Sequence, residues 1–195
     1  KAGKALRLPG NALAGGPVRS GELVLRLEDL AVGYLPGRGA LAPDGSEAAE
    51  PVTVARSPFL AAQRGDRIGL VGPNGAGKTT TLGMVTGLLR PDAGLVLIDG
   101  VEVWRDPVAA KRRIGVLPED LRLFDRLSGA ELLTYNGLLR GMPAAVVEAR
   151  ASELLEVLGL ADAAGTLVVD YSHGMRKKIA LAAALLHAPR VLFLD

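Results

Sequence analysis

The fold of this chain is decided by one stretch of sequence, Gly72-Pro73-Asn74-Gly75-Ala76-Gly77-Lys78-Thr79, which fits the phosphate-binding pattern G-x-x-x-x-G-K-[ST]. An apolar run that is typical of a strand, residues 67–71, comes directly before it, and a helix-like run from Thr80 to Leu89 follows. Glycines let the backbone fold around an anion, and the start of a helix adds partial positive charge where the phosphates would lie. The stretch therefore predicts a binding site for a nucleoside triphosphate.

Two side chains at the end of this loop have distinct expected roles. Lys78 supplies a mobile positive charge for the β- and γ-phosphates, and the hydroxyl of Thr79 suits a Mg²⁺ ion. Thr80 continues the helix start behind them. We therefore expect every residue from Gly72 to Thr80 to take part in the nucleotide site.

Length and composition limit the other possibilities. The chain has 195 residues, 49% of them hydrophobic, which predicts one or two domains with a buried core. It has no cysteine, which excludes a disulfide framework and thiol catalysis, and its net charge of +2 does not demand a nucleic-acid partner. No run of 18 apolar residues or signal peptide is found, so no transmembrane helix is expected. The chain starts without Met and stops on Asp195, and we read it as a piece of something longer.

The order of the expected elements predicts an α/β fold. The strand-like runs are 22–28, a run that begins at Val52, 66–71, 95–99, 114–117 and 191–194. The helix-like runs after the phosphate loop are 107–113, 128–140, 143–158 and 175–187. This mixture predicts a P-loop NTPase core with a mostly parallel sheet and an antiparallel β portion at the N-terminal side.

Three further segments complete the expected organisation. Residues 1–20 are predicted to be a flexible leader, and 35–51, rich in Pro and Gly, a loop insertion. Residues 21–195 would then form one incomplete ATP-binding domain, in which about 120–170 is an inserted helical subdomain.

A second motif follows the last strand-like run. Residues 191–194 are apolar and Asp195 comes next, so a buried strand would deliver a carboxylate at its C-terminal end. Beside a phosphate loop such a carboxylate orients the shell of a Mg²⁺ ion. The alternative is a core strand that happens to end in Asp.

The third motif is Tyr171-Ser172-His173-Gly174-Met175-Arg176-Lys177-Lys178, at the start of a predicted helix. Ser172 offers a hydroxyl, Gly174 an exposed N–H, and the helix its positive end, which together make an anion site. Positive side chains oppose the helix dipole in the first turn, which is costly unless an anion lies nearby. The alternative for the three basic side chains is a solvated basic face.

Residues 171–195 resemble the signature motif and following strand of ATP-binding cassette (ABC) ATPases, in the SHGM spelling of some bacterial export systems. The family consensus is Ser-Gly-Gly-Gln, so His173 and Met175 depart from it. Residues 66–89 resemble the family as well. The resemblance implies that Ser172, His173, Gly174 and Met175 contact the γ-phosphate of an ATP held by another cassette. Two cassettes would then enclose two ATP molecules and Mg²⁺ head to tail.

The resemblance assigns roles to residues outside the motifs too. Tyr34, placed after the first strand, would stack on adenine, and Glu119, where the family usually has Gln, would lie in a loop that touches Mg²⁺ and the transmembrane partner. Thr79, Glu119 and Asp195 would be the metal ligands. No catalytic residue falls within the chain, because the family's general base comes directly after the position of Asp195.

The resemblance implies the ATP-driven motor subunit of an exporter. Its partners would be a second cassette and transmembrane permease subunits, contacted through residues 115–140 at the cytoplasmic face of the membrane. Two alternatives stay open. A soluble protein with two such cassettes that acts on ribosomes would explain residues 22–34 and 66–80 as well. An ordinary P-loop kinase or GTPase explains residues 72–79 but leaves residues 171–178 without a role.

Overall fold

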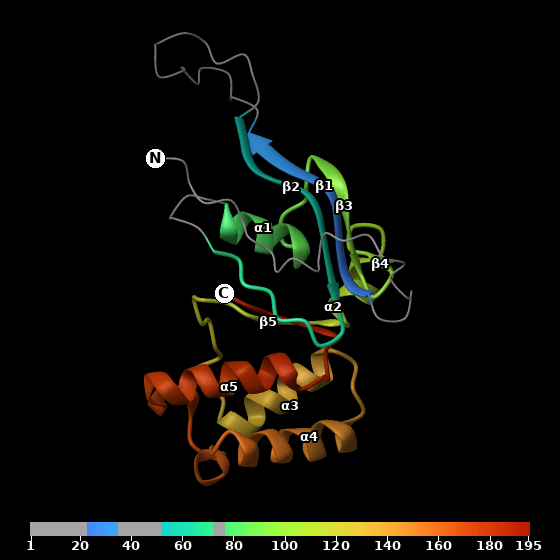
Figure 1. Ribbon diagram of the computed structural model, residues 1–195. Coiled ribbons are helices and arrows are strands. Elements are labelled where there is room, and N and C mark those ends of the chain that lie inside the picture. The colour runs from blue at the N-terminus through green and yellow to red at the C-terminus, as the bar shows by residue number, and fades with distance from the viewer. Residues whose placement is uncertain (1–22, 35–51, 72–76) are drawn as a thin grey trace, which may run out of the picture. The chain divides into compact units, whose positions relative to one another are not determined.

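The computed structural model describes residues 23–34, 52–71 and 77–195. The chain divides into two compact units, Lys1–Lys111 and Arg112–Asp195, and each is described by itself (Figure 1). The predicted leader, the predicted loop insertion and residues 72–76 of the phosphate loop lie outside the described residues. Among the helices that are described, none combines the length and the apolar character needed to cross a membrane.

A four-stranded antiparallel sheet is the framework of the first unit (Figure 1). Its strands run in the order β2-β1-β3-β4 and are β1 (Leu23–Tyr34), β2 (Val52–Gln63), β3 (Ala93–Ile98) and β4 (Val101–Glu102). Alternation along β1 puts Leu25 and Leu27 on one face, opposite Ile98 and Val96 of β3, and all four side chains are buried. The antiparallel portion that the sequence predicted is present.

A bulge in β1 changes which of its side chains point into the core. The register with β3 shifts between Glu28 and Ala31, and Asp29 takes a left-handed backbone conformation at φ 45°. Strict alternation from Leu27 would turn Leu30 outward, yet Leu30 is fully buried. The extra residue therefore keeps the apolar face of this long strand continuous.

Strand β4 was not predicted, although the sequence carries a signal for it. Asp99 and Gly100 form the two-residue turn between β3 and β4, with φ values of 48° and 76°, and Ile98 pairs with Val101. Left-handed conformation at both turn residues is typical of a tight hairpin, for which Asp-Gly is a preferred sequence.

Two helices belong to the first unit, α1 (Lys78–Val85) and α2 (Pro107–Lys111). Both are shorter at their C-terminal ends than the predicted 80–89 and 107–113. Helix α1 ends early because Gly87 adopts φ 72° and the N–H of Leu88 donates to the carbonyl of Gly83 over 2.8 Å. The Thr86 hydroxyl also donates to the Leu82 carbonyl, so the last carbonyls are satisfied without another turn.

The prediction of a strand over residues 66–71 is wrong for this structure. A turn at Gly65 ends β2, where the N–H of Gln63 donates to the carboxylate of Asp66 over 2.9 Å. The run that follows belongs to neither sheet, and Val71 is 81% exposed. A strand needs a neighbour for its backbone hydrogen bonds, and in the described part of the chain no strand pairs with this run.

The second unit holds a parallel pair of strands, β5 (Ile114–Leu117) and β6 (Val191–Leu194), with the bounds that the sequence predicted. Their pairing runs from Ile114 opposite Val191 to Leu117 opposite Leu194. Two expectations are corrected here. The described residues contain one parallel pair rather than a mostly parallel sheet, and β6 is only partly buried, since Leu194 is 60% exposed.

Three helices pack against one another in the second unit (Figure 1). They are α3 (Gly129–Leu139), α4 (Ala144–Val157) and α5 (His173–Leu185), and the 3₁₀ turns η1 (Ala161–Ala163) and η2 (Val168–Asp170) lie between α4 and α5. Buried side chains of all three helices form one core, with Leu132 from α3, Val147 from α4 and Ile179 from α5 fully enclosed. The core of the predicted helical region therefore extends past residue 170 and includes α5.

Helix ends in this unit follow from local sequence. Ser128 and Glu131 form a reciprocal capping box at the start of α3, and Pro143 is the N-cap of α4. Gly159, the first residue after the predicted run 143–158, ends α4 at φ 63°. Helix α5 begins two residues before the predicted Met175, because the hydroxyl of Ser172 caps it.

Candidate nucleotide site

The described part of the phosphate loop is its last turn. Residues Gly72, Pro73, Asn74, Gly75 and Ala76 lie outside the described residues, and Gly77 is the N-cap of α1 with φ 80° and ψ 15°. A residue with a Cβ atom is strained in that left-handed conformation, so glycine is suited to this position. The chain then enters the helix directly at Lys78.

The first turn of α1 presents groups that suit a phosphate. Lys78, Thr79 and Thr80 are its first residues, and the first N–H groups of a helix have no partner within it. The backbone continues from Gly77 through Thr81, whose N–H and hydroxyl both reach the Gly77 carbonyl over 2.8 Å. Thr79 is exposed. The geometry therefore fits an anion at the start of α1.

A second helix start, that of α5, has a different construction. The hydroxyl of Ser172 accepts a hydrogen bond from the N–H of Met175 over 3.3 Å, which uses one lone pair and leaves its hydrogen available. His173 and Gly174 occupy the first two helical positions, are exposed, and have N–H groups without a helical acceptor. The structure thus brings Ser172, His173 and Gly174 together at one helix end that can bind an anion.

Two of the three basic residues that follow, Arg176 and Lys178, lie against other groups of the second unit. Arg176 Nη2 lies 2.9 Å from Asp125 Oδ1, and Arg176 Nη1 donates to the carbonyl of Val168 over 3.2 Å. The ammonium of Lys178 lies near Gly159, at the C-terminal end of α4, where a positive charge is favourable. For Arg176 the counter-charge is therefore the carboxylate of Asp125, a residue that sequence reasoning did not single out.

Two predicted metal ligands follow neighbouring strand ends. Glu119 comes two residues after β5, and Asp195 directly after β6. The N–H of Asp195 donates to the carbonyl of Leu117 over 3.0 Å, so the two strand ends are in register. Glu119 and Asp195 are exposed at this edge, whereas the third predicted ligand, Thr79, belongs to the first unit. Within the described residues, no cluster of three or more His, Cys, Asp or Glu side chains suitable for a metal is found.

The prediction for Tyr34 needs one correction. Tyr34 is the last residue of β1, paired with Val52 of β2, rather than a loop residue after the strand. Strand β1 is longer than the predicted 22–28 because residues 29–34 continue to pair with β2 past the bulge.

His187 lies at the end of the predicted helical run 175–187 and follows α5 in the structure, where its ring is partly buried. Its Nε2 lies 2.8 Å from the carbonyl of Ile114 in β5, and a carbonyl can only accept, so Nε2 carries the hydrogen. Burial lowers the pKa of His187, and the guanidinium of Arg140, 3.3 Å from the same nitrogen, lowers that pKa further. The charge of Arg150 lowers the pKa of His187 by a smaller amount, whereas the hydrogen bond to Ile114 raises this pKa.

We expect acid to destabilise the second unit through His187. Because the folded state has the lower pKa, the unfolded chain binds more protons, so stability falls as pH drops below about 6.5. Urea unfolding between about pH 7.5 and about pH 5.5 should show a steeper loss for the wild type than for His187→Gln. His173→Gln, which removes an exposed ring, is the matched control and should behave as the wild type. Equal slopes for wild type and His187→Gln would contradict the assignment.

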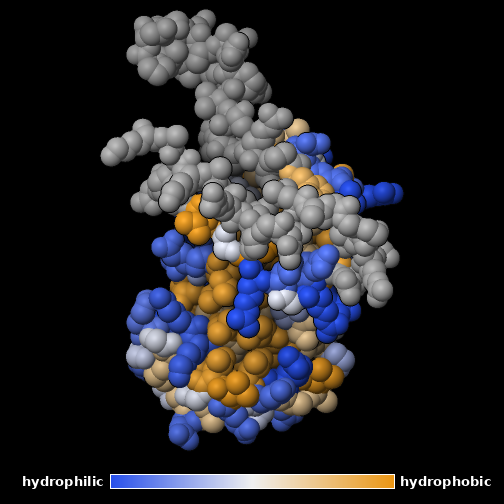
Figure 2. Space-filling model, in the orientation of Figure 1, coloured by the Kyte–Doolittle hydropathy of each residue, from blue (hydrophilic) through white to orange (hydrophobic). Residues whose placement is uncertain are grey.

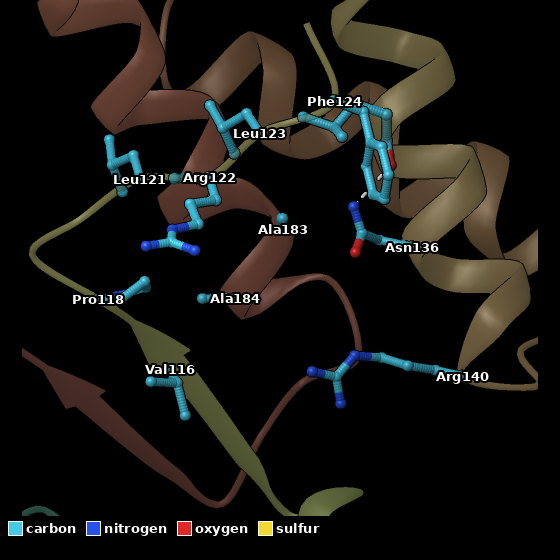
Figure 3. A pocket seen from close by; sticks show the side chains of 12 residues that line it. Val116, Pro118, Leu121, Arg122, Leu123, Phe124, Asn136, Arg140, Ala183 and Ala184 are labelled. Atoms are coloured by element: carbon cyan, nitrogen blue, oxygen red, sulfur yellow. Dashed lines mark hydrogen bonds between the residues drawn. The ribbon is translucent and has the colours of Figure 1, made fainter. Parts of the chain in front are cut away.

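A pocket of about 170 Å³ lies in the second unit, between the segment after β5, helix α3 and helix α5 (Figure 3). Its apolar lining includes Pro118, Leu121 and Leu123, and the side chains of Asn136 and Arg140 reach toward it from α3 and its C-cap (Figure 3). Burial lowers the pKa of Arg140.

Apolar side chains are also exposed close to this pocket. On the face shown in Figure 2, hydrophobic residues gather over the helical part of the second unit, with hydrophilic residues around them. Phe124, which lines the pocket, is 53% exposed, and its ring packs edge-on against the ring of Tyr135 in α3 with 5.1 Å between the ring centroids. Leu139, also in α3, is 67% exposed. Contiguous exposed apolar surface is typical of an interaction site.

Comparison with known proteins gives a consistent set of relatives. The sequence profile described as "ABC transporter" matches residues 58–195. The chain is 34% identical over 143 residues to the linearmycin resistance ATP-binding protein LnrL of Bacillus subtilis, which covers 73% of this chain and 46% of LnrL. It is 45% identical over 136 residues to the daunorubicin resistance ATP-binding protein DrrA3 of Streptomyces coeruleorubidus, covering 70% of this chain and 43% of that protein.

A solved structure, that of the ATP-binding subunit of an ABC transporter, is similar with a TM-score of 0.73 and 27% identity. The likeness covers 88% of this chain and 65% of that chain. The chain spans less than half the length of LnrL and of DrrA3.

Proposed function

Because this chain belongs to the ABC transporter family, we propose that it is the ATP-binding and ATP-hydrolysing motor part of an export system that works as a head-to-tail pair of cassettes. The observation that carries the proposal is the presence of two different helix starts in one chain. Helix α1 begins after Gly77 with Lys78, and α5 begins after Ser172 with exposed N–H groups. Two phosphate-binding surfaces on each chain suit a pair in which every ATP lies between two cassettes.

Each proposed contact follows from the chemistry of the residue. Lys78 and the amides at the start of α1 hold the β- and γ-phosphates of a cassette's own ATP, and Tyr34 stacks on its adenine. From the other cassette, the hydroxyl of Ser172 and the N–H of Gly174 donate to the γ-phosphate. The loop residues Gly72–Ala76 complete the phosphate cradle.

The proposed Mg²⁺ ligands are the oxygens of Thr79, Glu119 and Asp195. Hydroxyl and carboxylate oxygens are the donors that Mg²⁺ prefers, and the parallel register of β5 and β6 presents the two acidic residues at neighbouring strand ends. Bound Mg²⁺ supplies charge neutralisation at the phosphates. The role of the three residues is to orient that ion and the phosphates.

We place the contact with permease subunits at the surface formed by residues 115–140. Its support is the pocket between β5, α3 and α5 together with the exposed Phe124 and Leu139. An apolar hollow with an amide and a guanidinium at its edge suits an amphipathic segment of another protein. Through such partners the chain would act at the cytoplasmic face of a membrane.

The relatives support export as the direction of transport. Both LnrL and DrrA3 are named as resistance ATP-binding proteins, and resistance that depends on transport requires movement of a compound out of the cell. The same relatives favour a transporter over the soluble ribosome-acting factor that the sequence left open.

Binding of MgATP tests the proposal directly. We expect calorimetry to show saturable binding that weakens without Mg²⁺, and thermal unfolding to shift upward with ligand. At 100 times the dissociation constant, a ligand that binds only the folded state stabilises it by about 2.7 kcal/mol. The absence of both heat and thermal stabilisation with millimolar MgATP, in a sample shown to be folded, would overturn the motor function.

A further inference from the structure

We propose that Arg176 is a positioning residue, which through Asp125 fixes the start of α5 to the segment that follows Glu119. The inference rests on the proposed function, because it concerns the Ser172–Gly174 surface that we place against ATP. Arg176 does not touch nucleotide in this proposal. It sets the direction in which the donors at the start of α5 point.

The side chain of Arg176 is held at two points rather than one. Its two terminal nitrogens reach two different acceptors, a carboxylate oxygen of Asp125 and the backbone carbonyl of Val168. The Arg176 side chain is 25% exposed and the Asp125 side chain 50% exposed, so water screens the ion pair from the side of Asp125 and the carbonyl of Val168 contributes to holding the guanidinium. The planar fork of a guanidinium makes both contacts only at one orientation. Arg176 therefore resists rotation of α5 about its own axis.

The partners of Arg176 belong to a strip in which two segments are joined through their backbones. The N–H of Val168 donates to the carbonyl of Leu127 over 2.9 Å, and the N–H of Val169 donates to the carbonyl of Asp125 over 3.1 Å. Ser128 and Leu167 also form a β-bridge. Asp125 is thus held by its backbone as well as by its carboxylate, which makes it a firm anchor.

The strip connects two parts of the proposed site along short stretches of chain. Residues 118–125 lead from the end of β5 past Glu119 to Asp125, and residues 168–172 lead from η2 to the cap of α5. Any displacement of the loop that carries Glu119 is passed to the start of α5 if the Arg176–Asp125 contact holds. Without that contact, the backbone strip stays but α5 gains freedom to turn.

The position of Arg176 in α5 indicates that its ion pair with Asp125 does more than stabilise the helix. Arg176 lies in the first turn of α5, where a positive charge opposes the helix dipole. Arg150, by contrast, donates to the carbonyl of Leu186 at the other end of α5, where a positive charge is favourable. Both side chains hold α5, so Arg150 provides a matched control for a purely structural role.

The test compares nucleotide binding with nucleotide-driven association in the full-length protein. Arg176→Gln and Asp125→Asn should each leave MgATP affinity within about twofold of wild type. Each should weaken association of two chains, measured by analytical ultracentrifugation with Mg²⁺ and a non-hydrolysable ATP analogue, about tenfold. The double variant should associate as well as the single variant that associates less, since both substitutions remove the same contact between Arg176 and Asp125. Arg176→Lys should restore association only in part.

Arg150→Gln is the control for a purely structural loss in α5, and thermal unfolding is recorded for all variants. It should associate like the wild type even where its melting temperature falls as far as that of Arg176→Gln. Wild-type association of Arg176→Gln, or an equal loss in Arg150→Gln, overturns the inference while the motor function stands. A wild-type protein that binds MgATP but never associates overturns the cassette pair, and this inference with it.

Discussion

Replacement of Lys78 by alanine is expected to weaken MgATP binding about 100-fold while the fold stays intact. Lys78 is the first residue of α1 and is partly exposed, so the truncation opens no cavity in the core. Its ammonium would face the most highly charged part of the nucleotide. Truncating one partner of a hydrogen-bonded charge pair costs about 2–5 kcal/mol, and each 1.4 kcal/mol is about tenfold in affinity.

Calorimetric titration of MgATP into wild type, Lys78→Ala and Lys111→Ala measures this effect. Lys111→Ala removes an exposed lysine of the same unit at the end of α2, so it controls for the general loss of one positive charge. We expect its affinity to match the wild type. If Lys78→Ala binds MgATP as tightly as Lys111→Ala, the phosphates are not held at the start of α1 and the assignment of the site is wrong.

Short, self-contained patterns in the sequence predicted their elements well. Strands β5 and β6 are apolar runs of four residues, and the structure gives both the predicted bounds. The ends of α4 follow from Pro143 and Gly159, whose conformations are set by their own chemistry. In these places the local signal and the final packing agree, so the sequence alone is sufficient.

Patterns that depend on a distant partner were predicted less well. The run before the phosphate loop has the composition of a strand, but whether it becomes one depends on a neighbour, and no described strand pairs with it. The bulge at Asp29 likewise exists only relative to the register of β3. Because periodicity reports which side chains prefer burial, it does not report where the backbone hydrogen bonds are made.

The residues of the candidate site also differ in whether a local sequence pattern was enough to identify them. The motifs that carry Lys78, Ser172 and Asp195 were found because each combines residue type and spacing in one stretch. Asp125 and His187 were not assigned their roles, since each acts through a residue far away in the sequence. The acceptor of His187 is 73 positions away, in Ile114. A Ser-His-Gly-Met motif predicts an anion site, but only the fold shows that Arg176 is turned toward Asp125 rather than toward that anion.

The bulge in β1 leads to the second large expected effect, a loss of about 2–4 kcal/mol in the unfolding free energy of the first unit on Gly94→Ala. Gly94 has φ 84°, which costs a residue with a Cβ atom about 1 kcal/mol. A Cβ atom there would also overlap the backbone of Glu28 and Asp29, at the bulge itself. Overpacking adds about 1–3 kcal/mol, and backbone atoms of a paired strand have little room to move.

Gly100→Ala is the control that separates these two contributions. Gly100 has a similar φ of 76°, but a Cβ atom there would meet nothing within 4 Å, so only the conformational cost of about 1 kcal/mol remains. Urea unfolding followed by the fluorescence of Trp104 reports on the same unit, since Trp104 is the only tryptophan in the chain. Equal losses in the two variants would show that β3 moves away from the bulge at little cost. A clearly larger loss for Gly94→Ala would show that the close contact at Asp29 fixes the register of β1 and β3, and with it the buried face that Leu27 and Leu30 share.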